Sequence, residues 1–420
     1  MVGTAHSIGS MPRSHSPESL LMITPYTRNA IVLGLLSAIG PFAIDMYLPA
    51  LPTIAADLKA SPAAVQMTLM SFFVAFGVCQ IVYGPVSDMV GRKPPLYVGL
   101  ALFIAGSIGC GLAPSIEWLI AFRFVQGIGA SSVMVIPRAI IRDLHTGTEA
   151  TRLMALVMLV LSVSPILAPL TGSALIVPFG WRAVFAAVTL VAVIGLVLLT
   201  VCQQETHAPE HRVVVSVRNV LASFGQLMTH GRFLGLTFIG GLGMASFFSF
   251  LAGSSFVYIE HFGLTPTQFS VAFAVNAVGF IGASQFAAPL GERIGMARMV
   301  VIATALYAAF TVALLVVTLM GVDSLPMMMA LLLAGFTAMG VVIPSTMVLA
   351  LEEHGPIAGM ASALGGTLQM ITGGVMIVIV SLVFDGTPLP MVAAIAGCAI
   401  GALIVSIVTL GFARALPHGA

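Results

Sequence analysis

A chain of 420 residues that is 59% hydrophobic and only 7% charged cannot form an ordinary water-facing surface, because soluble domains carry about 25% charged residues. The net charge of +1 gives no reason to expect nucleic acid or strongly acidic partners. The composition therefore excludes a soluble protein and predicts one embedded in a lipid bilayer.

The polar residues 1–28 contain Ser, Pro and His and precede the first apolar stretch, so we expect a disordered cytoplasmic tail there rather than a signal peptide. About twelve apolar stretches then follow, each long enough to cross roughly 30 Å of hydrocarbon as a helix. We place these spans near 29–50, 65–86, 95–113, 118–138, 152–177, 182–202, 233–258, 267–290, 299–320, 325–350, 358–384 and 389–412.

The first span contains an acid, Asp45, about two-thirds of the way along it. A carboxylate at that depth costs roughly 3 kcal/mol, so it should face the protein interior or a wet cavity. Desolvation favours the protonated form of a carboxyl group, which makes Asp45 the candidate proton carrier. The alternative is an acid solvated at the outer interface that makes a structural hydrogen bond. Beyond the span, residues 51–58 are expected to form a short surface helix.

A charged turn joins the second and third spans. In it, Asp88 can pair with Arg92 across the turn or cap a neighbouring helix, and Gly91 permits a left-handed backbone. We expect this segment to hold two helix ends together in one conformation and release them in another. The alternative is a plain solvated loop. The residues assigned to this conformational latch are Gly84, Asp88, Gly91, Arg92 and Lys93.

A weaker copy of the turn occurs at 288–298, with proline, acid and glycine in matching order. Val135-Ile136-Pro137 also recurs as Val342-Ile343-Pro344. Such a repeat predicts two related halves, the architecture of a secondary transporter. We assign six-helix bundles to 29–202 and 233–413, and a cytoplasmic linker to 203–232.

The fourth span contains Arg123, an always-charged group that needs a partner at that depth. The candidate partners are Asp45, an outer-side carbonyl and the amide of Gln126, which lies one turn further along. Small residues follow Arg123 and would let a neighbouring helix approach closely. The alternative is an arginine that snorkels to the outer surface.

The fifth span holds Pro165, Pro169 and Gly172 among small residues. Each proline removes a helix hydrogen bond and favours a bend, while small residues allow tight packing. A hinge and a simple packing kink are equally compatible with this pattern. After the span, Trp181 is expected to anchor an outer turn at the membrane interface.

Aromatic and amide side chains of the second half are candidates for a substrate cavity, although isolated amides in membrane helices often only join helices. The cavity residues that we expect are Tyr47 and Gln126 of the first half and Phe247, Asn276 and Gln369 of the second.

Most of the 16 Lys and Arg residues fall on one side of the predicted spans if both termini are cytoplasmic. This asymmetry predicts the N-in, C-in orientation. The four cysteines are far apart within predicted spans, and we expect neither a disulfide framework nor a metal site.

Taken together, these motifs resemble the major facilitator superfamily and, within it, drug:proton antiporters of the bicyclomycin/chloramphenicol-resistance type. Residues 84–96 are similar to the superfamily's loop signature, and Arg123 with residues 126–130 to its fourth-helix signature. Residues 44–52 resemble the first-helix stretch of this drug-efflux subfamily. In the fifth helix, residues 168–173 depart from the usual antiporter pattern, and Met89 replaces a common basic residue.

The resemblance implies an all-α fold of twelve transmembrane helices and a bacterial inner-membrane exporter that exchanges protons for hydrophobic drugs or metabolites. Asp45 and Arg123 would serve proton coupling. The alternative is a proton-coupled exporter of an endogenous neutral solute such as a sugar, amino acid or siderophore. We expect no enzymatic activity and no cofactor, because no nucleophile–base pair and no ligand spacing among the His residues is visible. We also expect a monomer.

Overall fold

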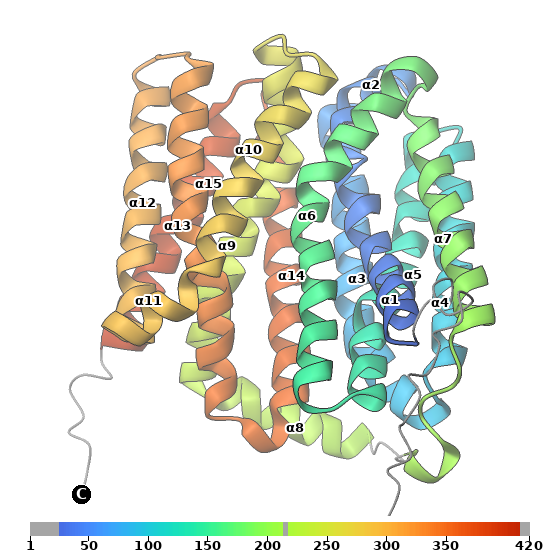
Figure 1. Ribbon diagram of the computed structural model, residues 1–420. Helices are drawn as coiled ribbons and strands as arrows, with labels where there is room; N and C mark the ends of the chain where they lie inside the picture. Colours follow the sequence, from blue (N-terminus) through green and yellow to red (C-terminus); the bar gives the residue numbers. More distant parts are fainter. Residues whose placement is uncertain (1–24, 213–216, 412–420) are drawn as a thin grey trace, which may run out of the picture.

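The computed structural model describes residues 25–212 and 217–411, and every regular element in these ranges is helical (Figure 1). Most of the expected N-terminal tail, residues 1–24, lies outside the described residues. Residues 25–28 already belong to the first helix, which begins at Pro25.

The first half consists of six long helices and two short elements that precede the second long helix. Its elements are α1 (Pro25–Asp45), η2 (Leu48–Ala50), α2 (Leu51–Asp57), α3 (Pro62–Val90), α4 (Lys93–Leu112), α5 (Ile116–Leu144), α6 (Gly147–Phe179) and α7 (Arg182–Cys202). The short surface helix expected at 51–58 is therefore present as α2.

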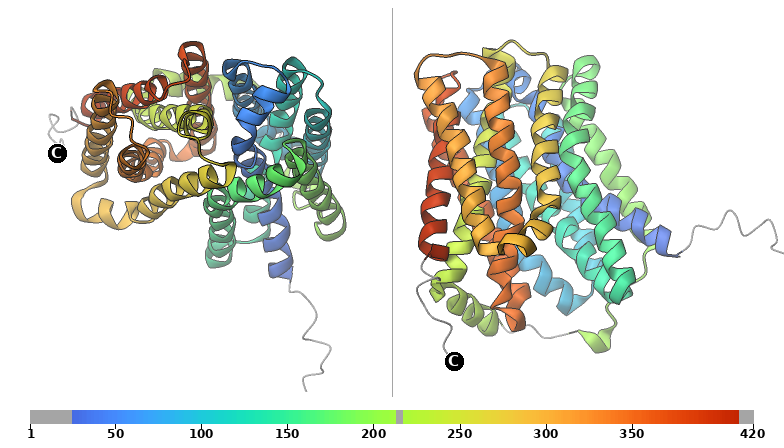
Figure 2. Two further views of the ribbon diagram at one scale, coloured as in Figure 1. Left: turned by 90° about the horizontal axis from the view of Figure 1, so that it is seen from above. Right: turned by 60° about the vertical axis from the view of Figure 1, so that its left-hand side comes forward.

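The second half repeats this arrangement. Its elements are α9 (Gly231–Ser255), η4 (Phe256–His261), α10 (Pro266–Gln285), α11 (Ala287–Ile294), α12 (Met296–Leu319), α13 (Leu325–Glu352), η5 (Gly355–Ile357), α14 (Ala358–Val383), α15 (Leu389–Ser406) and η6 (Ile407–Gly411). Viewed from above, the two halves lie side by side as separate bundles (Figure 2).

Within the described ranges, twelve helices are long and apolar enough to span a membrane, as the sequence predicted. Two elements differ from expectation. The eighth stretch, expected to run to residue 290, ends at Gln285 and is followed by the separate helix α11. The linker is not simply a loop, because it contains the 3-10 turn η3 (Pro209–His211) and the amphipathic helix α8 (Val217–Thr229).

In both the charged turn and its weaker copy, a glycine with positive φ ends the preceding helix. Gly91 ends α3 with φ +103°, and Gly295 ends α11 with φ +86°. In each case the next helix begins within two residues. A side chain would strain this left-handed backbone, which accounts for glycine at both positions.

Small residues set the spacing of helices in the first half. A Cβ atom on Gly127 would lie 2.4 Å from the Phe72 carbonyl oxygen of α3, and one on Gly129 would lie 2.4 Å from the Phe103 nitrogen of α4. The close approach expected for the small residues after Arg123 is confirmed.

The molecule has two distinct ends. Figure 1 shows α8 at one end of the molecule, which we call the linker end, and α2 at the opposite end, which we call the α2 end. The Gly91 turn and residues 203–212 belong to the linker end, and Trp181, which is hydrogen-bonded to the last residue of α2, belongs to the α2 end. Trp181 is not an interfacial anchor, contrary to expectation. Its side chain is 3% exposed and its Nε1 donates a hydrogen bond to Asp57 at 3.0 Å, because packing against Phe185 encloses the ring.

The two halves contact each other through α3 with α14 and through α6 with α10. Three hydrogen bonds join them within residues 25–212 and 217–411. The hydroxyl of Ser255 donates to the Leu48 carbonyl at 2.7 Å, that of Ser270 to Pro169 at 2.8 Å, and that of Thr367 to Gly77 at 2.8 Å.

Candidate transport site

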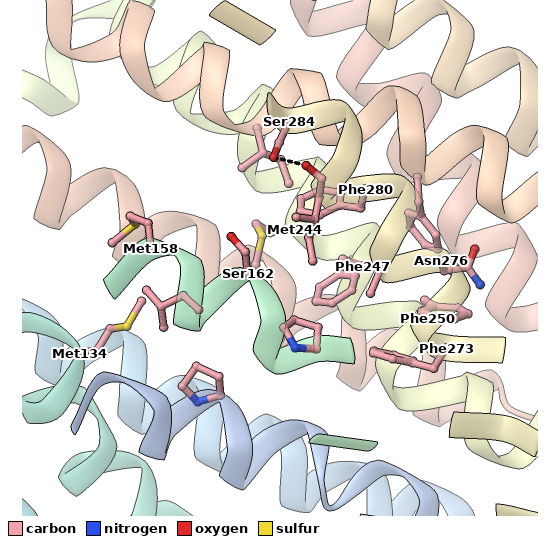
Figure 3. Close-up of a pocket in the computed structure, with 17 residues that line it drawn as sticks. Met134, Met158, Ser162, Met244, Phe247, Phe250, Phe273, Asn276, Phe280 and Ser284 are labelled. Atoms are coloured by element: carbon pink, nitrogen blue, oxygen red, sulfur yellow. Dashed lines mark hydrogen bonds between the residues drawn. The ribbon is translucent and has the colours of Figure 1, made fainter. Parts of the chain in front are cut away.

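A cavity of about 410 Å³ lies between the two halves (Figure 3). Helices α1, α5 and α6 line one side of it, and α9, α10 and α13 line the other. Most of its lining is aromatic, sulfur-containing or aliphatic. The lining residues are Pro41, Met134, Met158, Leu161, Ser162, Pro165, Met244, Phe247, Phe250, Phe273, Asn276, Ala277, Phe280, Ile281, Ser284, Phe336 and Ile343.

No lining residue is acidic or basic, and only Ser162, Asn276 and Ser284 carry side-chain polar groups. The Ser284 hydroxyl already donates to the Ile281 carbonyl at 2.7 Å. The aromatic rings pack on one another, as in the stacked pair Phe250 and Phe273, whose centroids are 5.6 Å apart. This volume and lining are typical of a site for an apolar small molecule.

The cavity lies on the linker side of a contact that closes the α2 end. Pro165 lines the cavity, and the Pro169 carbonyl, one turn nearer the α2 end, accepts the bond from Ser270. Helix α10 runs in the opposite direction, so Asn276 also lies on the linker side of Ser270. The structure is therefore a state in which the halves meet at the α2 end.

The sequence-predicted cavity residues lie in three places. Phe247 and Asn276 line the cavity. Tyr47 and Gln126 are fully buried in the first half, and Gln369 packs against Gly240 in the second half. The methionines and most of the phenylalanines of the lining were not singled out, since the sequence gives no signal that separates them from other apolar residues.

Arg123 is fully buried, and its guanidinium lies 4.7 Å from the Tyr47 ring centroid and 4.4 Å from that of Phe72. Its Nη1 donates to Gln126 Oε1 at 2.7 Å and to the Ala43 carbonyl at 3.1 Å. Two of the three expected kinds of partner, the Gln126 amide and a backbone carbonyl, are thus confirmed. The alternative of a snorkelling arginine is excluded.

A polar chain extends from this group in both directions. Gln126 Nε2 donates to Ser107 at 2.7 Å, and the Tyr47 hydroxyl is hydrogen-bonded to Thr68 at 2.8 Å. The side chains of α4, α5, α3 and the segment after α1 are therefore fixed around one buried cation.

Asp45 is the last residue of α1 and is 6% exposed. Its carboxyl group makes no hydrogen bond or ion pair with any residue in 25–212 or 217–411, so Arg123, which donates to Gln126 and Ala43, is not its partner here. Pro41, four residues earlier on the same helix, lines the cavity. Residues four apart share a helix face, so Asp45 follows the cavity wall by one turn towards the α2 end.

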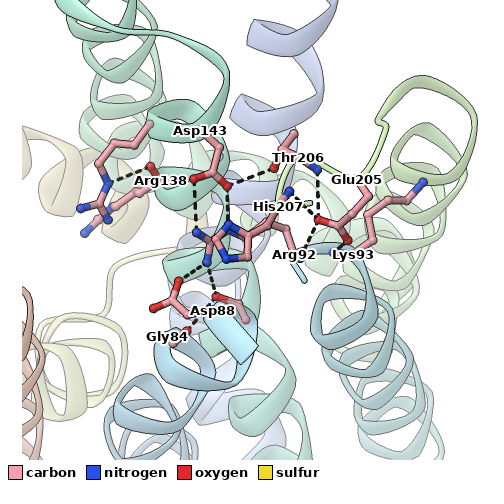
Figure 4. A network of polar contacts seen from close by, with 11 residues as sticks. Gly84, Asp88, Arg92, Lys93, Arg138, Asp143, Glu205, Thr206 and His207 are labelled. Atoms are coloured by element: carbon pink, nitrogen blue, oxygen red, sulfur yellow. Dashed lines mark hydrogen bonds and ion pairs between the residues drawn. The ribbon is translucent and has the colours of Figure 1, made fainter. Parts of the chain in front are cut away.

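A second polar group, which we call the linker-end cluster, surrounds Arg92 (Figure 4). The Arg92 guanidinium pairs with Asp88, as expected, and Nε donates to Asp143 at 2.7 Å. The backbone nitrogens of Arg92 and Lys93 donate to the Glu205 carboxylate at 2.8 and 3.0 Å. Burial alone would lower the pKa of Arg92, but the hydrogen bonds to Asp143 and Asp88 outweigh it and raise that pKa.

Glu205 fixes the linker to the start of α4. Burial acts to raise its pKa, but backbone N–H groups of Lys93, Arg92, His207 and Thr206 all donate to the carboxylate and hold the pKa below its ordinary value. Lys93 Nζ also donates to the Gln203 carbonyl at 2.6 Å. Gly84 contributes through its carbonyl, which accepts from Ser87 at 2.8 Å.

Asp143 and Glu205 are two residues of the linker-end cluster that the sequence pattern did not predict. Asp143 lies just beyond the predicted fourth span and Glu205 just beyond the predicted sixth, both on the membrane face where Arg92 was expected. The available signal was that acids and a basic residue, Arg92, lie at the same membrane face. That signal does not distinguish Asp143 and Glu205 from the other acids in the loops.

The three residues of the expected hinge all lie where α6 meets other parts of the molecule. Pro165 lines the cavity and Pro169 accepts the bond from Ser270. A Cβ atom on Gly172 would lie 2.3 Å from the Met46 carbonyl oxygen. These contacts establish close packing at this part of the helix, and a hinge motion remains a prediction.

Two related six-helix bundles with an apolar cavity between them define a multi-pass membrane transporter rather than an enzyme. The chain belongs to the Major Facilitator Superfamily, whose sequence profile matches residues 33–377.

Among its relatives, an uncharacterised transporter of this superfamily, YdgK of Bacillus subtilis, is 34% identical over 86% of this chain and 90% of its own length. A bicyclomycin resistance protein homologue of Haemophilus influenzae is 31% identical over 88% and 93%. Multidrug resistance protein D of Escherichia coli is 30% identical over 82% and 86%. The similarity to this resistance branch of the superfamily is confirmed.

A solved structure of a POT family transporter in complex with 5-aminolevulinic acid has a TM-score of 0.74 with this chain. The match covers 92% of this chain and 96% of the other, at 13% identity. At this identity it confirms the fold alone.

Proposed function

We propose that the protein exports hydrophobic drugs or metabolites across a bacterial inner membrane in exchange for entering protons, by alternating access of its two halves. The termini are cytoplasmic in this proposal, so the linker end faces the cytoplasm and the chain acts as a monomer. The observation that carries the proposal is the cavity between the halves, apolar and free of charged side chains.

The cavity chemistry favours neutral or weakly polar cargo. Burying an ion without a partner is costly, and no lining residue could pair with one. Eight methionine and phenylalanine side chains offer an adaptable surface of rings and thioethers, which suits binding of several apolar ligands. The names of two relatives, a bicyclomycin resistance protein homologue and a multidrug resistance protein, agree with this substrate class.

Asp45 is the proposed proton carrier because it is a buried acid without a partner among the described residues, one turn from the cavity wall. Inward movement of a proton releases about 2.3 kcal/mol per 100 mV of membrane potential. Protonation at Asp45 and cargo in the cavity would alternate, so that each turnover exchanges one for the other.

Arg123 is proposed to act on Asp45 through the backbone. It donates to the carbonyl of Ala43, two residues before Asp45, and so fixes the end of α1. The linker-end cluster is proposed to stabilise one of the two states, because it joins α3, α4, α5 and the linker at a single arginine.

The test is a drug-resistance panel in an efflux-deficient bacterium that expresses wild type, Asp45→Asn or the control Asp385→Asn. Asp385 is an exposed acid that bonds only to Thr387 at the α2 end. We expect resistance from wild type and control and its loss in Asp45→Asn at equal expression. Full resistance from Asp45→Asn would remove the proton-carrier role.

A second measurement separates exchange from other coupling. Drug added to the detergent-purified protein at neutral pH should release protons from wild type and not from Asp45→Asn. Resistance without proton release would contradict exchange. Absence of any resistance, together with uptake of a neutral solute into vesicles, would favour the endogenous-solute exporter instead.

A further inference from the structure

A groove lies beside the cavity, on the lateral surface of the molecule between α6 and α10. This lateral groove has a volume of about 940 Å³ and is lined by Tyr26, Arg152, Ala155, Leu156, Met158, Leu159, Ser162, Val163, Ile166, Ile281 and Gln285. Met158, Ser162 and Ile281 line both the groove and the cavity, so the two spaces share a wall.

The groove has a polar end and an apolar body. The first groove residue of α6, counted from the linker end, is Arg152, and Tyr26 and Gln285 come from the linker-end turns of α1 and α10. Beyond Arg152, the α6 residues of the groove are apolar except for Ser162. From residue 152 to residue 166 the helix rises roughly 21 Å, whereas one leaflet contributes about 15 Å of hydrocarbon.

The apolar body of the groove faces the bilayer. Leu156 is 42% exposed and Leu159 is 57% exposed, and both lie on a helix that spans the membrane. The groove therefore runs from headgroup level at the linker end into the hydrocarbon of the adjacent leaflet.

Arg152 is a cation without a counter-ion in the described parts of the chain. The nearest acid on its own helix, Glu149, is hydrogen-bonded to His145 at 3.1 Å. Tyr26, beside Arg152 in the groove, packs edge-on against the same histidine, with ring centroids 5.8 Å apart. An anion at the mouth of the groove would thus find one unpaired guanidinium and two neutral polar side chains.

We propose that this groove is a binding site for an anionic phospholipid, whose phosphate contacts Arg152 while an acyl chain lies along α6 between the two halves. Basic pockets between membrane helices recognise anionic headgroups in this way. Each buried methylene of the chain contributes about 0.8 kcal/mol. The lipid would occupy the seam between α6 and α10 and support the state in which the halves meet at the α2 end.

The test titrates the purified full chain in detergent with phosphatidylglycerol or with phosphatidylcholine of identical acyl chains, and counts bound lipids by native mass spectrometry. We expect one phosphatidylglycerol molecule to bind about tenfold more tightly than phosphatidylcholine. Both phosphates can accept from Arg152, but choline adds a cation beside the guanidinium, and no groove residue is an acid that could pair with it. Equal affinity for the two lipids would overturn the proposal.

Matched arginine variants locate the headgroup. Arg152→Gln should lose the preference for phosphatidylglycerol and Arg152→Lys should keep most of it. Arg142→Gln is the control, because Arg142 is also exposed at the linker end but lies outside the groove and donates only to the Arg138 carbonyl. Equal weakening by Arg142→Gln and Arg152→Gln would show diffuse attraction and no site.

Two further arms identify the occupant. Ala155→Trp, which fills the groove and leaves Arg152 intact, should weaken binding, and Ile166→Trp is the alternative if Ala155→Trp is not monodisperse. Undiminished binding to both variants would overturn the acyl-chain assignment. Glycerol 3-phosphate should not displace the lipid, and displacement would assign the site to a soluble phosphate ester instead.

Discussion

At the scale of single residues, the buried guanidinium of Arg123 is stabilised mainly by rings and dipoles and not by an acid. Its Nη1 makes two hydrogen bonds, while Nε and Nη2 have no hydrogen-bond partner in the described chain. Tyr47 and Phe72 supply aromatic faces within 5 Å. A flat, delocalised cation suits this place, whereas a compact ammonium does not.

We therefore expect Arg123→Lys to destabilise the protein by about 2 kcal/mol even though the charge is kept, because the ring contacts of a desolvated cation are lost. The measurement is thermal unfolding of the detergent-purified protein. The control is Arg232→Lys, which changes an exposed arginine paired with Glu353 and should have little effect. Equal midpoints for Arg123→Lys and wild type would contradict this account of the site.

The limits of residue-level prediction are visible at Arg123 and Asp45. Their presence within spans was evident from the cost of burying charge. The separation between them was not, because it depends on how α1 and α5 rotate about their axes. Tyr47 illustrates the same limit, since it was expected in the cavity and instead packs beneath Arg123.

At the scale of helices, the spans followed closely from hydropathy, and the predicted 182–202 coincides with α7. Hydropathy detects elements that must lie in lipid. It does not detect α8, which lies in the linker and is apolar on one face only. It also merged α10 with α11, since nothing polar separates them at Phe286.

The contact between α6 and the segment after α1 requires a residue without a side chain. Because a Cβ atom at position 172 would lie 2.3 Å from the Met46 carbonyl oxygen, Gly172→Ala should push the two segments apart and cost about 2 kcal/mol. Gly397→Ala is the control, since its Cβ would meet nothing within 4 Å in α15. Thermal unfolding should rank Gly172→Ala below wild type and Gly397→Ala at or above it, and any other order would refute the packing argument.

The linker-end cluster predicts a dependence on pH. Because the folded state holds the pKa of Glu205 below its ordinary value of 4.5, its carboxylate stabilises the fold above that pH. The contribution is lost as the pH falls through the lower folded pKa. Glu205→Gln should therefore be less stable than wild type at pH 7 and indistinguishable from it in acid.

Thermal unfolding of wild type and Glu205→Gln between pH 7 and pH 3 measures this difference. Glu210→Gln serves as the control, since Glu210 lies in the same linker and outside the cluster. A difference between Glu205→Gln and wild type that stays constant over the whole range would show that the carboxylate charge is not responsible.

At the scale of the whole molecule, the duplication seen in the sequence explains why one cavity and one closing contact arise between two similar bundles. The glycines at the two turns, Gly91 and Gly295, both have positive φ. The repeat is therefore present in the backbone conformation as well as in the sequence. The sequence does not predict which conformational state the structure shows, because the two halves can meet either at the α2 end or at the linker end.

Few polar contacts hold the two halves together at the α2 end. The hydroxyls of Ser255 and Ser270 bond to carbonyls of the other half, and each bond contributes about 1 kcal/mol. The combined change Ser255→Ala and Ser270→Ala should therefore shift the balance towards opening of the α2 end by about thirtyfold. Spin labels at the exposed positions 59 and 322, in a chain whose four cysteines are replaced by serine, should report a larger population with a long distance between the labels.

Ser345→Ala is the control for this prediction. It removes a buried hydroxyl that bonds within its own helix, to the Val341 carbonyl, and should leave the distance distribution unchanged. If both variants shift it equally, loss of any buried hydroxyl suffices and these two bonds do not control access.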